Sequence, residues 1–167
     1  MSLVKPTILE LEVIMSKLNY QYGNNLGSKF MDNFLDEISI RRSKRTGRIR
    51  EIYVKDCLVF TLRPTDGFLI PTLAGGKLIK ELVSPPHLRV VIDEDAVNFV
   101  ARGRSVFSKH VVSIDYNLRA GDEVIVVDTN DNLVAIGRLV LSPIEIPSSS
   151  RGVAVRVRKG VLIDRST

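Results

Sequence analysis

Two adjacent prolines near the middle of the chain, Pro85 and Pro86, constrain its folding more than any other feature. Proline lacks a backbone N–H and pushes the preceding residue towards extended backbone, so a helix that reaches this point has to end. The chain has 167 residues, which is enough for two small domains. The segment 84–87 therefore predicts a domain boundary, with one domain over residues 1–84 and a second over residues 88–162.

The first half combines helical and strand patterns. Thr7 and Glu10 have the spacing of a capping box, and apolar residues then recur at helical intervals until Gly23. From Ile38 the period changes to two, which is typical of strands. The pattern predicts helices over 7–23, 26–35 and 78–83, and strands over 51–55, 58–62 and 68–72 with a turn at Asp56 and Cys57.

The second half is richer in strands. After a strand over 88–92, the acids at 93–95 favour the first turn of a short helix, which ends at Gly103. Short strands separated by turn residues follow over 106–107, 111–112, 123–127, 133–141 and 153–157, and such spacing predicts a small barrel. We therefore expect an α+β protein, in which a small N-terminal α/β domain precedes a mostly β pseudo-barrel with one or two short helices.

The residues that usually build active sites are scarce. The chain has one cysteine and two histidines, with no metal-binding spacing and no phosphate-binding glycine motif. We expect no metal, no cofactor and no catalysis; Cys57 fits a hairpin-edge position and is the one plausible nucleophile if the protein is an enzyme. No apolar run approaches the roughly 20 residues that span a bilayer, and the N-terminus does not resemble a secretory signal. These features predict a cytoplasmic protein without a membrane partner.

Charge gives the first indication of function. Lys and Arg number 24 against 19 Asp and Glu, a net charge of +5, which favours an anionic partner such as nucleic acid. The cations form three runs without acids, each of which also fits a solvated surface. The first run comprises Arg41, Arg42, Lys44, Arg45, Arg48 and Arg50; the second comprises Arg102, Arg104 and Lys109; the third comprises Arg151, Arg156, Arg158 and Lys159.

Two segments suggest how these cations would be used. Gly103 lets the backbone approach a phosphate with free N–H groups, although a glycine after a helix is also a common C-cap. Valines alternate with other residues over 153–158. In a strand the valines would enter the core, while Arg156 and Arg158 on the other face form a basic ladder or protect an edge strand. His110 fits a contact with phosphate or a base, or the closing of a turn.

In order and spacing, residues 93–97, 103–107, 118–124, 135–138 and 151–160 resemble the PUA domain, a small RNA-binding barrel. Residues 20–23, 45–50 and 61–67 resemble the domain that precedes PUA in archaeosine tRNA-guanine transglycosylases. Together the two resemblances cover nearly the whole chain, imply an archaeal setting, and do not include the catalytic barrel of those enzymes.

The resemblance implies a non-catalytic protein that binds tRNA at the acceptor stem and 3′ CCA end. It further implies a role as a separately encoded binding subunit beside a transglycosylase catalytic subunit. Residues 41–50 are a possible second RNA contact. The implied RNA-binding residues are Arg102, Gly103, Arg104, Ser105, Lys109, His110, Arg151, Gly152, Arg156, Arg158 and Lys159.

Two alternatives fit the same sequence. A PUA protein can serve ribosome assembly or translation by binding rRNA, and PUA domains also occur as protein-interaction modules that bind no RNA.

Overall fold

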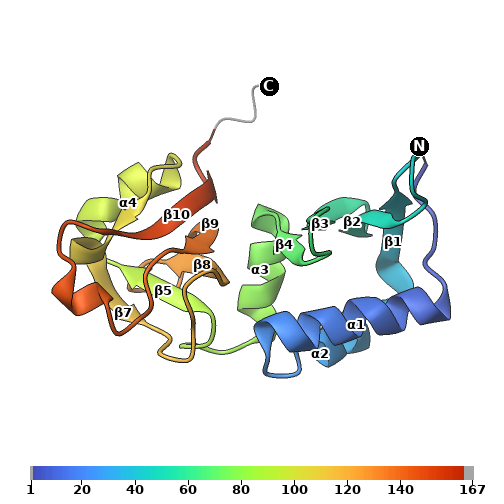
Figure 1. The fold of residues 1–167 in the computed structure, drawn as a ribbon, viewed down its shortest axis with the longest axis horizontal. Coiled ribbons are helices and arrows are strands. Elements are labelled where there is room, and N and C mark those ends of the chain that lie inside the picture. The colour runs from blue at the N-terminus through green and yellow to red at the C-terminus, as the bar shows by residue number, and fades with distance from the viewer. Residues whose placement is uncertain (1, 164–167) are drawn as a thin grey trace. The chain divides into compact units, whose positions relative to one another are not determined.

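The computed structural model describes residues 2–163, which form one compact unit up to Val83 and a second from Ser84 on (Figure 1). Each unit has its own sheet and its own helices. The expected α+β class, with a mostly β second half, is confirmed.

The first unit combines three helices with a four-stranded antiparallel sheet in the order β1-β2-β3-β4. Because the strands follow the chain order, the β1–β2 and β3–β4 turns lie at the same end of the sheet. The elements are α1 (Ile8–Tyr22), α2 (Leu26–Phe34), η1 (Leu35–Glu37), β1 (Ile38–Arg42), β2 (Ile49–Val54), β3 (Cys57–Leu62), β4 (Leu69–Pro71) and α3 (Leu73–Leu82).

The predicted capping box starts α1 and links it to the sheet. Thr7 accepts a hydrogen bond from the Glu10 backbone N–H, and the Glu10 carboxylate accepts one from the Thr7 N–H at 2.8 Å. The same carboxylate forms an ion pair with Arg42 on β1. The hydrogen bond from Arg42 holds the pKa of Glu10 below its ordinary value.

This geometry predicts a pH-dependent loss of stability. Glu10→Gln keeps an acceptor for the Thr7 N–H but removes the ion pair, so we expect it to lower the free energy of unfolding by about 1 kcal/mol at pH 7. Because the folded pKa is lowered, the wild-type advantage is present above the ordinary glutamate pKa of about 4.3 and disappears as the pH falls through the folded value. Urea unfolding of both proteins between pH 7 and pH 2 measures this difference in the free energy of unfolding. A difference that stays constant with pH would contradict the role given to the ion pair of Glu10 with Arg42.

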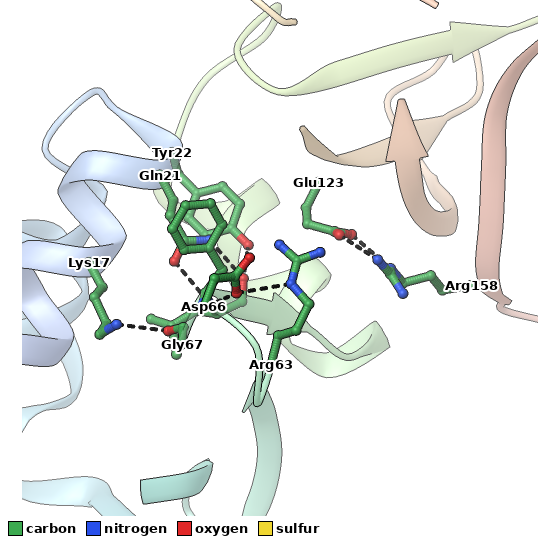
Figure 2. A network of polar contacts seen from close by, with 10 residues as sticks. Lys17, Gln21, Tyr22, Arg63, Asp66, Gly67, Glu123 and Arg158 are labelled. Atoms are coloured by element: carbon green, nitrogen blue, oxygen red, sulfur yellow. Dashed lines mark hydrogen bonds and ion pairs between the residues drawn. The ribbon is translucent and has the colours of Figure 1, made fainter. Parts of the chain in front are cut away.

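Side chains of α1 bond to the edge strand β4 and the turn before it (Figure 2). Gln21 bonds both the N–H and the carbonyl of Leu69, at 2.8 and 3.1 Å, and the Tyr22 hydroxyl donates to that carbonyl at 2.6 Å. Lys17 donates to the Gly67 carbonyl at 2.8 Å. These bonds satisfy backbone groups that an edge strand would otherwise expose, and they fix the β3–β4 turn.

Two details of the first unit differ from the prediction. The β2–β3 turn lies at Lys55 and Asp56, one residue earlier than expected, because both residues take the positive φ that a two-residue hairpin requires. Helix α3 begins at Leu73, five residues before the predicted start, with Thr72 as its N-cap. Gly75 and Gly76 weaken the helical pattern in the sequence, although both are buried in this helix.

The second unit is a six-stranded sheet in the order β6-β10-β9-β8-β5-β7, antiparallel except for the β5–β8 pair. The edge strands β6 and β7 are separated in the chain only by the three residues of η2, so the sheet nearly closes into a barrel. Its elements are β5 (Arg89–Ile92), α4 (Glu94–Ala101), β6 (Val106–Phe107), η2 (Ser108–His110), β7 (Val111–Ile114), β8 (Glu123–Val127), β9 (Leu133–Leu139), η3 (Ile146–Ser148) and β10 (Val153–Gly160).

Candidate nucleic-acid interface

The glycine loop after α4 is a helix C-cap. The Gly103 N–H donates to the Val100 carbonyl at 2.9 Å and the Arg104 N–H donates to the Phe99 carbonyl at 3.1 Å, while Gly103 has a φ of 98°. This is the Schellman arrangement, which satisfies the last carbonyls of the helix. The expectation of free N–H groups facing a phosphate is therefore wrong for Gly103 and Arg104. The exposed side chains of Arg102 and Arg104 remain as the cationic donors of this loop.

His110 closes a local structure. Its Nδ1 lies 3.0 Å from the Asp93 carboxylate, which also caps α4 by accepting the Ala96 N–H at 3.1 Å. In the same short helix η2, the Ser108 N–H and hydroxyl both donate to the Gly152 carbonyl, at 2.9 and 3.1 Å. These contacts hold the exposed Lys109 beside the start of β10.

Strand β10 alternates as the sequence predicts over only part of its length. Ala154 and Val155 are both buried, and the pairing shifts register between Val153 and Val155 and again between Val157 and Lys159. Such irregularities place neighbouring side chains where simple alternation would not. The predicted alternation therefore holds for Arg156 and Arg158, which are both exposed, and fails at Ala154, which is buried, and at Lys159, which is exposed next to Arg158.

The two arginines of β10 have different surroundings. Arg158 binds the buried carboxylate of Glu123 on β8 with two hydrogen bonds, at 3.0 and 2.7 Å (Figure 2). Arg156 lies opposite Arg138 on β9, and Arg138 lies opposite Glu123. Directly paired residues share one face of a sheet, so Arg138 joins Arg156 there. Arg138 is not among the residues that the sequence predicts for this surface, because only the strand register reveals its neighbours.

Strand pairing brings the predicted residues of this unit together. Strand β6, which follows the loop 102–105, pairs with β10, and η2 bonds to Gly152 next to the exposed Arg151. At the other end of β10, the Leu162 N–H donates to the Ala101 carbonyl at 2.8 Å, beside the loop. The cations that flank β6, those in and before β10, and Arg138 on β9 thus lie around three neighbouring strands. We call this set the β10 surface: Arg102, Arg104, Lys109, Arg138, Arg151, Arg156 and Lys159.

The basic run of the first unit divides into paired and unpaired cations. Arg41 pairs with Glu51 at 3.0 Å and lies over the Tyr53 ring, and Arg42 pairs with Glu10. The Glu51 carboxylate also accepts the Tyr53 hydroxyl, which raises the pKa of that tyrosine. The remaining four cations are exposed and lie in and beside the β1–β2 turn: Lys44, Arg45, Arg48 and Arg50.

The part of the chain that the structure describes gathers no metal-binding cluster. Between residues 2 and 163, no three His, Cys, Asp or Glu side chains gather so that they would hold a metal ion. Cys57 is exposed as the first residue of β3. None of the helices in this range has the length and apolar character that crossing a membrane requires.

Comparison with known families matches both halves of the chain. Residues 13–86 match the patch-forming domain C2 of tRNA-guanine transglycosylase, and residues 88–161 match the PUA domain, an RNA-binding fold. Two solved structures share the fold over 98% of this chain and 96% of theirs. A hypothetical protein from Pyrococcus horikoshii OT3 has a TM-score of 0.74 at 22% identity, and a conserved PUA domain protein from Thermoplasma acidophilum has a TM-score of 0.71 at 20% identity.

Curated relatives include archaeal enzymes named tRNA-guanine(15) transglycosylase. The chain is 38% identical to the Methanococcus vannielii enzyme over 96% of its own length, and 40% identical to the Thermococcus kodakarensis enzyme over 89%. It spans only 24% and 25% of those two relatives, and the match does not include their catalytic portion. The chain therefore combines a domain of the patch-forming C2 type with a PUA domain, like the C-terminal part of archaeal tRNA-guanine(15) transglycosylases.

Proposed function

We propose that this protein binds tRNA at the acceptor stem and 3′ CCA end, without catalysing a reaction itself. The observation that carries the proposal is the identity of 38–40% with enzymes named for their action on tRNA, across both units. The exposed cations around β6 and β10 of the PUA domain support the proposal as well, because they would bind the phosphates of an RNA. Work on tRNA would place the protein in the cytoplasm.

The chemistry of the β10 surface suits a single-stranded RNA end. Arg and Lys side chains bind phosphates and fix the position of the RNA, whereas unpaired bases are accessible for recognition. All of its cations belong to the second and third basic runs of the sequence except Arg138, which β9 contributes. Arg158 has a different role, since its guanidinium is bound to Glu123 and orients that part of β10. We assign Gly103, Ser105, His110 and Gly152 to shaping this surface.

We propose a second RNA contact at the β1–β2 turn. Lys44, Arg45, Arg48 and Arg50 supply the charge, while Arg41 and Arg42 belong to ion pairs that hold the hairpin. The β3–β4 turn lies at the same end of the sheet, where Arg63 is bound to Asp66 at 3.0 Å and lies over the Phe68 ring. The β1–β2 turn with its four exposed cations, beside a second turn, suits an RNA backbone.

We also propose that the chain works with a tRNA-guanine transglycosylase catalytic portion, because its relatives carry such a portion beyond the matched quarter of their length. Adding this protein to a catalytic portion that lacks its own C2 and PUA domains is expected to increase its affinity for tRNA. Unchanged affinity would contradict the partnership and leave RNA binding by the chain itself intact.

The direct test measures binding of archaeal tRNA at several salt concentrations, with and without the 3′ CCA. We expect tighter binding of the intact tRNA. Arg104→Ala and Arg156→Ala are each expected to reduce the slope of log K against log salt by about 0.7–0.9, because each variant binds one phosphate fewer. Lys77→Ala, which removes an exposed cation of α3 outside both clusters, is the matched control. Equal binding of both tRNAs would favour rRNA as the target, and no binding of either would favour a protein partner.

A further inference from the structure

A groove in the second unit lies outside the residues that the sequence predicts as RNA-binding, except for Lys109. Its volume is about 220 Å³. The residues that line it come from β7 and the turn after it, from η2, and from the segment around η3; we call the first and the last of these groups its two walls. Its lining residues are Ser108, Lys109, Val111, Val112, Ser113, Ile114, Tyr116, Pro143, Ile146, Pro147 and Ser150.

The groove has an apolar floor and a polar rim. Ile114, Pro143 and Ile146 are buried, whereas Tyr116 is 75% exposed. Ser113 and Ser150 bring exposed hydroxyl groups to the rim, and Lys109 brings the single charge. Because no acidic side chain is among the lining residues, the groove suits a ligand with a flat apolar face, polar edges and a nearby negative charge.

Hydrogen bonds to a carboxylate hold each wall in place. The turn that carries Tyr116 is fixed by Asp115, which is 3% exposed and accepts the N–H groups of Leu88 at 2.9 Å and Asn117 at 3.0 Å. In the opposite wall, the Glu145 carboxylate accepts the N–H and hydroxyl of Ser142, at 2.8 and 2.7 Å. These hydrogen bonds lower the pKa of Glu145, so the carboxylate keeps them at neutral pH. The groove is therefore formed before a ligand arrives.

The size of the groove limits its occupant. Pockets for drug-sized ligands have volumes of about 300–1,000 Å³, so a groove of about 220 Å³ takes one ring system and not a whole cofactor. Nucleobases are flat, have polar edges, and stack on aromatic side chains such as tyrosine. A phosphate attached to such a base would find Lys109, which belongs to the β10 surface. That surface adjoins the groove because Ser108 bonds to Gly152.

We propose that this groove binds one unpaired nucleobase of the RNA whose phosphates lie on the β10 surface. Tyr116 stacks on the base, Ser113 and Ser150 face its polar edges, and Lys109 contacts its phosphate. This inference rests on the proposed function and deepens it, because it assigns base contacts to a chain with few aromatic residues. This site differs from the contacts made by the arginines, which are purely electrostatic, because its floor is apolar.

A mutant cycle between protein and RNA tests the inference. The probes are short acceptor-stem hairpins with a 3′ CCA in which each of the three end nucleotides in turn lacks its base. Stacking contributes about 1–3 kcal/mol per base, so we expect Tyr116→Ala to weaken binding of the intact hairpin roughly 5- to 150-fold. Against one of the abasic hairpins the same substitution is expected to have no effect, since the base it contacts is missing.

Controls keep the result interpretable. Tyr20→Ala removes an equally exposed tyrosine from α1 in the other unit and is expected to change nothing. Ser113→Phe fills the groove from an exposed position of β7 and is expected to reproduce the Tyr116→Ala pattern. Arg104→Ala is expected to weaken binding of intact and abasic hairpins equally, because it contacts phosphate.

Three outcomes would overturn the inference. If Tyr116→Ala weakens all hairpins equally, the side chain acts on the backbone and not on a base. If Tyr116→Ala and Ser113→Phe leave every affinity unchanged while Arg104→Ala weakens them, RNA binding stands and the groove belongs to another ligand, such as a protein segment. If the wild-type protein binds no hairpin at physiological salt, the proposed function fails together with the base site.

Discussion

Asp131→Asn is expected to destabilise the second unit by about 3 kcal/mol, because the buried Arg89 guanidinium loses the negative charge of the carboxylate that it binds with two hydrogen bonds. The Arg89 side chain is only 2% exposed, and it donates to both Asp131 carboxylate oxygens at 2.9 and 3.2 Å and to the His87 carbonyl at 3.0 Å. Asparagine keeps the shape of the side chain and tolerates the left-handed backbone of this position, where φ is 60°. The substitution therefore changes charge and little else.

A substitution of the other partner, Arg89→Met, separates the effect of charge from that of packing. Asp131 is 34% exposed, so Arg89→Met leaves a carboxylate that water still reaches, and we expect it to cost less than Asp131→Asn. The double variant Arg89→Met with Asp131→Asn is expected to be more stable than Asp131→Asn alone, since the buried guanidinium is no longer present. Asp95→Asn, at an exposed position of α4 in the same unit, is the control. Hydrogen exchange of the β8 amides, measured at increasing urea concentration, gives the free energy of unfolding of this unit. A larger loss of that free energy in Arg89→Met than in Asp131→Asn would contradict this explanation.

Gly75→Ala is the second large effect, and we expect it to destabilise the first unit by about 3 kcal/mol through overpacking. A Cβ at this position would lie 2.0 Å from the Val59 carbonyl oxygen on β3. Helix α3 has little freedom to move away, because the Thr72 hydroxyl donates to the Leu58 carbonyl at 2.6 Å and the Thr72 N–H donates to the Val59 carbonyl at 3.0 Å. The gain of about 1 kcal/mol in helix propensity is smaller than the clash.

Gly47→Ala provides the matched comparison within the same unit. Gly47 has a φ of 68° in the β1–β2 turn, and a Cβ there would meet nothing within 4 Å. Alanine there would be disfavoured only by the left-handed backbone, by about 1–2 kcal/mol. Urea unfolding of both variants, followed by hydrogen exchange of β3 amides, measures the difference. A Gly75→Ala protein as stable as Gly47→Ala would show that α3 and β3 can separate more easily than their hydrogen bonds indicate.

Local sequence signals were sufficient for much of the fold. The capping box of Thr7 and Glu10, the acids at the start of α4 and the turn at residues 63–67 act through neighbours within a few residues, and the structure shows each of them. The resemblance of separate segments to the PUA domain and to the domain before it is confirmed by the family matches. The RNA-binding residues themselves stay predictions, because likeness of sequence does not show contact with RNA.

The sequence by itself determined the α+β class, through short-range periodicity, and which families its halves resemble, through the order and spacing of short motifs. Only the tertiary structure decided what each cation does. Glu123 lies 35 residues before Arg158 yet binds its guanidinium, and Arg138 becomes a neighbour of Arg156 through the pairing of β9 with β10. Arg89 is buried by a partner 42 residues away. The sign of a residue's charge follows from its identity alone. The contribution of that charge to the free energy of folding depends on burial and on partners that strand register supplies from distant parts of the chain.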